Sequence, residues 1–83
     1  MKTTHIIKVN EQDEREKLLN ELKTNGYKLI QFDESEIISS ILPIIVDTEN
    51  KTISRMGNIT CAAAYASRNE YEDIETFWNE WKK

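Results

Sequence analysis

One cysteine and one histidine are the residues of this 83-residue chain with the greatest capacity for chemistry. Cys61 opens a predicted helix, where a helix dipole can lower the pKa of a thiol and favour a nucleophile. Such a nucleophile also needs a base, and the single candidate, His5, lies at the far end of the chain. We interpret Cys61, which precedes three alanines, as a small buried hydrophobic residue. The alternative, a small enzyme or ligand-binding protein that uses Cys61 and His5, requires an unusually reactive thiol.

Metal and phosphate chemistry have little support in the sequence. One histidine with one cysteine is fewer than the three or four ligands of a zinc site, and we interpret His5 as a solvated residue of an edge strand. The acidic groups at 11–16 and 33–36 lack the spaced ligands and glycine of a calcium loop. Gly26 and Gly57 are isolated, so they do not form a phosphate-binding loop. We therefore predict no enzyme activity, no metal and no cofactor.

The end of the chain carries an aromatic stripe. Ile74, Phe77, Trp78 and Trp81 recur at the i, i+3, i+4, i+7 spacing of one helical face. An amphipathic helix must bury such a stripe, either in its own core or against a partner. Core packing is the first expectation, because a small domain has few other large side chains for its interior. Four large residues exceed what one small sheet can cover, so we expect part of Trp78 or Trp81 to stay accessible.

Acidic residues precede and enter this terminal helix. Acids are favoured at helix N-termini by the helix dipole alone, and Asp73 is the natural N-cap. They also present carboxylates beside tryptophan, the residue type most enriched at binding hot spots. This combination suits a basic, nucleic-acid-binding groove on another protein. The predicted protein-binding site comprises Glu70, Glu72, Asp73, Glu75, Trp78 and Trp81.

Composition limits the class of partner and the compartment. Eleven basic and fifteen acidic side chains give a formal charge of −4, which disfavours direct nucleic-acid binding. No apolar stretch approaches membrane-spanning length, and no hydrophobic run near the start resembles a signal peptide. The single cysteine excludes an internal disulfide framework. A cytoplasmic protein without membrane contact is the expectation.

The elements that position these residues follow from hydrophobic periodicity. Four β-branched or aromatic segments are predicted strands: 5–9, 27–32, 44–46 and 52–55. Three segments are predicted helices: 11–24, 61–66 and 73–83. The second strand is expected to return beside the first and parallel to it, after the helix at 11–24. Residues 33–40 are compatible with a loop, a short helix or extended chain.

The predicted order is strand, helix, strand, strand, strand, helix, helix. It indicates a single α+β domain over residues 1–83, with one sheet of about four strands and helices mainly on one face.

Three segments carry a resemblance to known proteins. Residues 44–52, 58–67 and 74–77 form a pattern of hairpin, Cys-Ala helix and Phe-bearing terminal helix. This pattern resembles small uncharacterised proteins encoded by phages and mobile elements of Gram-positive bacteria. The resemblance implies an accessory protein that binds and inhibits host or rival machinery, and it brings no catalytic residues. The acidic terminal stretch is also superficially similar to those of small acidic anti-CRISPR inhibitors, which occupy the DNA-binding groove of a nuclease.

The leading hypothesis is a small acidic phage or mobile-element accessory protein that acts non-enzymatically. It would bind another protein and inhibit a host nucleic-acid-processing or defence enzyme. The alternative is a self-associating structural or scaffolding module, in which a hairpin edge or the aromatic helix pairs across a two-fold axis to give a homodimer.

Overall fold

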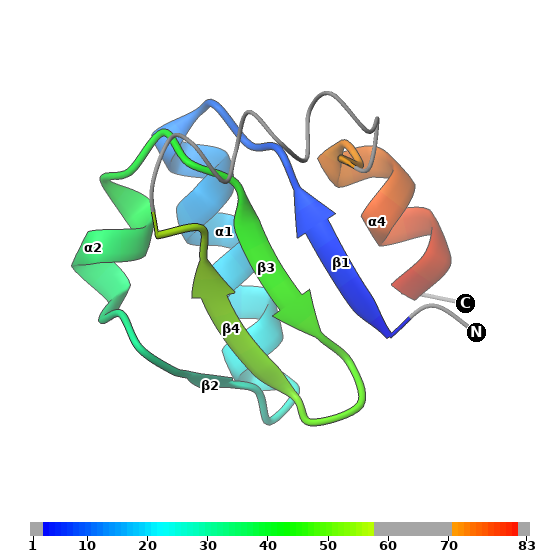
Figure 1. Cartoon of the computed structure of the whole chain (residues 1–83). Helices are drawn as coiled ribbons and strands as arrows, with labels where there is room; N and C mark the ends of the chain where they lie inside the picture. Colours follow the sequence, from blue (N-terminus) through cyan, green and yellow to red (C-terminus); the bar gives the residue numbers. More distant parts are fainter. Residues whose placement is uncertain (1–2, 58–70, 82–83) are drawn as a thin grey trace.

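The computed structural model describes residues 3–57 and 71–81, which form a four-stranded mixed sheet and three helices (Figure 1). The elements in chain order are β1 (Thr4–Ile7), α1 (Gln12–Thr24), β2 (Lys28–Leu29), α2 (Glu34–Ile38), β3 (Ile44–Asp47), β4 (Thr52–Arg55) and α4 (Ile74–Trp81). The predicted α+β class with one sheet of about four strands is confirmed. The predicted helix at 61–66 lies outside the described residues.

The strand order is β1-β3-β4-β2. β3 pairs antiparallel with both β1 and β4, and β2 pairs parallel with β4, so β1 and β2 run in the same direction. The prediction that β2 lies beside β1 is wrong, because the β3–β4 hairpin occupies the centre of the sheet between them. Ile44, Val46 and Ile53 of the hairpin are fully buried there. The two-residue β2 has too little apolar surface for a central place and forms an edge.

Residues 33–40, whose sequence is compatible with several conformations, contain helix α2. Its N-terminus is closed by a capping box: the Asp33 carboxylate accepts from Glu36 N at 2.9 Å, and the Glu36 carboxylate accepts from Asp33 N at 3.1 Å. Ile37 in its centre is fully buried. A helix therefore stands between β2 and β3, which the predicted element order lacks.

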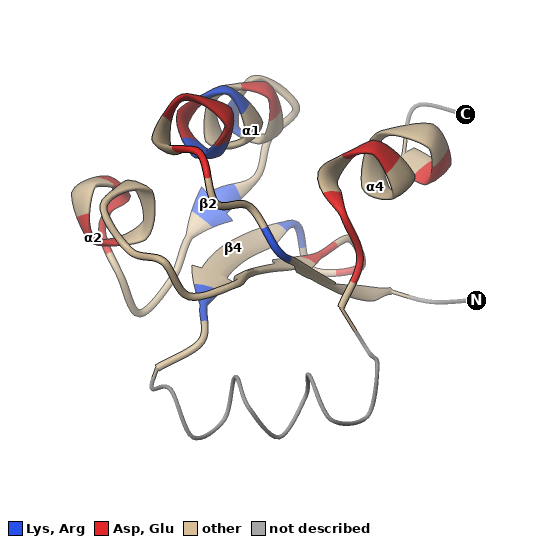
Figure 2. Ribbon diagram, turned by 90° about the horizontal axis from the view of Figure 1, so that it is seen from above, with Lys and Arg blue, Asp and Glu red and all other residues tan. Residues whose placement is uncertain are grey.

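The core lies between the sheet and the helices. Leu18, Leu19 and Leu22 of α1 are fully buried, together with Ile37 of α2 and Phe77 of α4. All three described helices lie on the same face of the sheet, as Figure 2 shows in a view along the layer. For the three helices of the described residues, the prediction of helices mainly on one face is confirmed. This arrangement brings α1, α2 and α4 into one layer, which we call the helical layer.

Arg15 of α1 faces the interior of the protein. It is only 1% exposed, although its side chain carries a charge. Nε and Nη2 donate to the carbonyl oxygen of Ile37 at 2.8 and 2.5 Å, and Nη1 donates to that of Val9 at 2.9 Å. Burial, and secondarily the charge of Arg55, lower the pKa of Arg15 to about 10, so the guanidinium remains protonated at neutral pH. The side chain thus joins α1 to the C-terminal end of α2 and to the β1–α1 loop.

The contribution of Arg15 can be measured with a charge-matched pair of variants. We expect Arg15→Met to lower the free energy of unfolding by about 2–4 kcal/mol, because the buried carbonyl groups of Ile37 and Val9 lose their donor. Lys17→Met removes the same charge from an exposed position and should change the free energy of unfolding by less than about 0.5 kcal/mol. Urea unfolding followed by circular dichroism measures both. Equal effects of the two substitutions would contradict the role assigned to Arg15.

Candidate functional site

The segment before α4 is fixed to the outer edge of β1. Glu72 N donates to the Ile6 carbonyl oxygen at 2.9 Å, and Lys8 N donates to that of Glu72 at 2.9 Å. These bonds form a parallel bridge between Ile7 and Glu72. The chain then turns and α4 packs beside β1 on the helical face (Figure 1). The position of the predicted binding site is therefore set by backbone pairing with the sheet.

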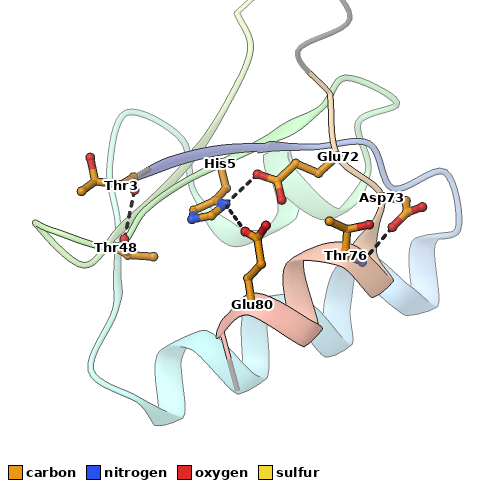
Figure 3. Close-up of polar contacts among 7 residues, drawn as sticks. All are labelled: Thr3, His5, Thr48, Glu72, Asp73, Thr76 and Glu80. Carbon is orange, nitrogen blue, oxygen red and sulfur yellow. Dashed lines mark hydrogen bonds and ion pairs between the residues drawn. The ribbon is translucent and has the colours of Figure 1, made fainter. Parts of the chain in front are cut away.

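Asp73 caps the helix, as predicted. Its exposed carboxylate accepts a hydrogen bond from Thr76 N at 2.8 Å (Figure 3). The hydrogen bonds from Thr76 hold the pKa of Asp73 below its ordinary value. Asp73 and Glu75 are both exposed at the start of α4. These two acids are available to a partner, whereas Glu70 lies outside the described residues.

The aromatic stripe forms a connected ring cluster. Phe77 is fully buried, and its ring centroid lies 5.6 Å from that of Trp78 and 5.8 Å from that of Trp81. Trp81 Nε1 donates to the Tyr27 hydroxyl at 3.3 Å, which joins α4 to the chain just beyond α1. Both tryptophans pack against the core but are only half-buried. The expectation that part of Trp78 or Trp81 stays accessible is confirmed.

A shallow surface depression lies beside the exposed edge of Trp81. It is lined by Glu21, Asn25, Tyr27, Lys51 and Trp81. The lining comes from the end of α1, the chain before β2, the β3–β4 turn and α4. The depression thus places Trp81 beside polar and charged side chains from three other parts of the chain.

The helical layer is strongly acidic (Figure 2). Its exposed or half-exposed acidic side chains are Asp13, Glu14, Glu16, Glu21, Glu34, Glu36, Glu75 and Glu80. Its basic residues are Arg15, which is buried, and two exposed lysines, Lys17 and Lys23. Lys23 Nζ is already paired with the Glu34 carboxylate at 2.5 Å. The fold therefore gathers on one face acids that are scattered over three segments of the sequence.

His5 and Glu72 differ from their sequence-based interpretation. The prediction of a solvated His5 is wrong: the residue is 5% exposed, because the chain at Glu72 and the ring of Phe77, centred 5.2 Å away, cover it. Glu72 is 9% exposed, so its carboxylate faces His5 and not solvent. Glu72 Oε1 lies 2.6 Å from His5 Nδ1, and Glu80 Oε2 lies 3.8 Å from the same nitrogen (Figure 3). Cys61 lies outside the described residues.

A signal for this cluster was present in the sequence. His5 is two residues before Ile7 on β1, so strand alternation places both side chains on the core face. Glu80 follows Phe77 by three residues, which places it near the buried side of α4. Their approach to Glu72, however, depends on the parallel bridge, which no local pattern predicts.

No family model, no curated protein and no solved structure gives a significant match to the chain. The resemblance to small phage and mobile-element proteins therefore stays a prediction. Among the helices of residues 3–57 and 71–81, none is both long and apolar enough to cross a bilayer.

The cap at Asp73 predicts a defined acid dependence. Because its pKa is lowered in the folded state, the carboxylate contributes stability above its unfolded pKa of about 4 and loses it as pH falls through the folded value. Asp73→Asn keeps an N-cap acceptor that does not titrate, so its stability should fall less steeply between about pH 4 and pH 2 than that of the wild type.

Asp13→Asn is the control, because the Asp13 carboxylate accepts no hydrogen bond from the described residues. Free energies of unfolding, measured by urea titration at several pH values, give the slope of stability against pH for the wild type and for each of the two variants. A wild-type slope that Asp73→Asn leaves unchanged would contradict the assigned pKa shift.

Proposed function

We propose that this protein acts without catalysis, by binding another protein through its acidic helical layer and the exposed edges of Trp78 and Trp81. The observation that carries the proposal is the gathering of eight acidic side chains on one face, beside two half-buried tryptophans. Tryptophan edges supply apolar contact area, and the surrounding carboxylates steer the encounter and select its orientation.

The charge of the layer defines the chemistry of the partner. A negative face attracts a positive one and repels phosphate, so a protein with a basic surface is favoured over DNA or RNA. Basic grooves of nucleic-acid-processing enzymes combine positive charge with apolar surface for bases. Inhibition would follow from occupation of such a groove, in a host processing or defence enzyme.

The biological setting is part of the same proposal. An accessory role in a phage or mobile element, in the cytoplasm of a bacterial host, rests on the resemblance of residues 44–52, 58–67 and 74–77. Self-association by strand pairing has weaker support. The outer edge of β1 is paired with Glu72 at Ile7, and β2 at the other edge has two residues.

Capture from a bacterial lysate, followed by reconstitution, tests the proposal. The wild-type protein is the bait, with Trp81→Ala and Glu75→Lys as variants of the proposed surface. Glu49→Lys is the charge-matched control, because Glu49 is exposed in the β3–β4 turn, outside the helical layer. Circular dichroism verifies that each variant is folded.

We expect the wild type and Glu49→Lys to retain one specific protein, and the two surface variants to bind the purified partner at least about tenfold more weakly. Binding should weaken with salt, and duplex DNA should compete for the partner. A partner that Trp81→Ala and Glu75→Lys retain unchanged would contradict the proposed surface. Light scattering that gave a homodimer, dissociated by Trp81→Ala, would favour the scaffolding alternative instead.

A further inference from the structure

We propose that His5, Glu72 and Glu80 form a binding site for one divalent transition-metal ion of the zinc type, at the junction of β1 and α4. The proposal does not rest on the protein-binding function, although the Glu80 side chain belongs to both the cluster and the acidic helical layer. The sequence has too few imidazole and thiol groups for a zinc site and no calcium loop, whereas the fold brings two carboxylates beside the imidazole.

The geometry fits a single ion. His5 Nδ1 and one carboxylate oxygen each from Glu72 and Glu80 all lie within 4.8 Å of one another. Nitrogen and oxygen ligands of a tetrahedral zinc ion lie about 2.0–2.2 Å from it, so their donor atoms are roughly 3.3–3.6 Å apart. The 2.6 Å between His5 Nδ1 and Glu72 Oε1 must therefore lengthen by less than about 1 Å, and the 3.8 Å to Glu80 Oε2 must shorten slightly. The Glu80 side chain is 54% exposed and can make the small adjustment that this requires.

Two of the three ligands are already held in place. The His5 ring is buried against the edge of Phe77, and Glu72 is fixed by its backbone bonds to Ile6 and Lys8. The third ligand, Glu80, lies at the border between the buried and exposed sides of α4, so its partly exposed side chain leaves an entry path from solvent. A site with two ligands on a fixed backbone, one exposed ligand and an open side matches three protein ligands plus water, once the carboxylates turn to their ligating positions.

The electrostatics of the cluster also favour a cation. His5 Nδ1 carries at most one proton, and Glu72 at 2.6 Å is placed to share it. The Glu80 carboxylate, 3.8 Å from the same nitrogen, is beyond hydrogen-bonding distance. Among the described residues, Glu80 forms no ion pair with a lysine or arginine. A divalent ion in the place of that proton would interact with all three groups at once.

The ligand types indicate which ions bind. An imidazole nitrogen with two carboxylate oxygens suits Zn²⁺ and neighbouring transition metals. Ca²⁺ and Mg²⁺ prefer sites built entirely from oxygen, so they should bind far more weakly. Because the ligands come from β1 and from both ends of the segment 72–80, the bound ion would fasten α4 to the sheet and raise the melting temperature.

Titration with ZnCl₂ tests the site in the full chain, prepared free of metal. We expect isothermal calorimetry to give one ion per chain, and the melting temperature to rise by at least about 4 °C at a hundredfold excess over the dissociation constant. MgCl₂ at the same concentration should leave the melting temperature unchanged. Glu80→Gln should weaken zinc binding at least tenfold.

Two matched variants isolate the proposed ligands. Glu75→Gln changes the same charge on the same helix outside the cluster and should bind zinc like the wild type. Cys61→Ala removes the one thiol and should also leave binding unchanged. The proposal would be overturned by a wild-type protein that binds no zinc, by equal binding in Glu80→Gln, or by loss of binding in Cys61→Ala.

Discussion

The three hydrogen bonds of the buried Arg15 guanidinium hold α1 and α2 together within the helical layer. Helix α2 has five residues, a length at which a helix is not stable by itself in water. Its position depends on the capping box, on burial of Ile37 and on the two donors that Arg15 directs at the Ile37 carbonyl oxygen. Burial of a charge costs free energy, and these bonds offset that cost while satisfying carbonyl groups that no helical amide reaches. The acids of α1 and α2 share a face because this one side chain joins the two helices.

Helix α4 depends on a different constraint, the pairing of residue 72 with β1. Eight residues are also too few for a stable isolated helix. The parallel bridge fixes where α4 begins, the Asp73 cap sets its first turn, and Phe77 fixes which side faces the core. With that side fixed, Trp81 lies beside the end of α1, with Trp78 packed against it, and Glu80 approaches β1. The partly exposed tryptophans and the cluster of His5, Glu72 and Glu80 are thus two consequences of the docking of α4 against β1.

Local patterns predicted the parts of this fold that are governed by local physics. The leucine stripe of α1, the β3–β4 hairpin and the aromatic face of α4 follow from side-chain periodicity and turn chemistry. Strand order does not, because it is decided by which strand buries the most apolar surface, and this comparison involves the whole chain. Arg15 occupies the leucine stripe, three residues before Leu18, but its charge conceals its burial, since carbonyl acceptors on distant segments satisfy it. The burial of His5 is hidden in the sequence for the same reason, because Glu72 and Phe77 approach it only in the folded chain.

The two proposals meet at α4, and their energetics are therefore linked. A partner that contacts Trp78 and Trp81 requires α4 to be docked, and an ion held by His5, Glu72 and Glu80 requires the same. If undocked conformations of α4 are populated, each ligand would shift the same equilibrium toward the docked state. By thermodynamic reciprocity, the ion would then strengthen partner binding by the factor by which the partner strengthens ion binding. The size of this coupling is limited by the free energy of docking α4, because neither ligand can contribute more once the helix is fully docked.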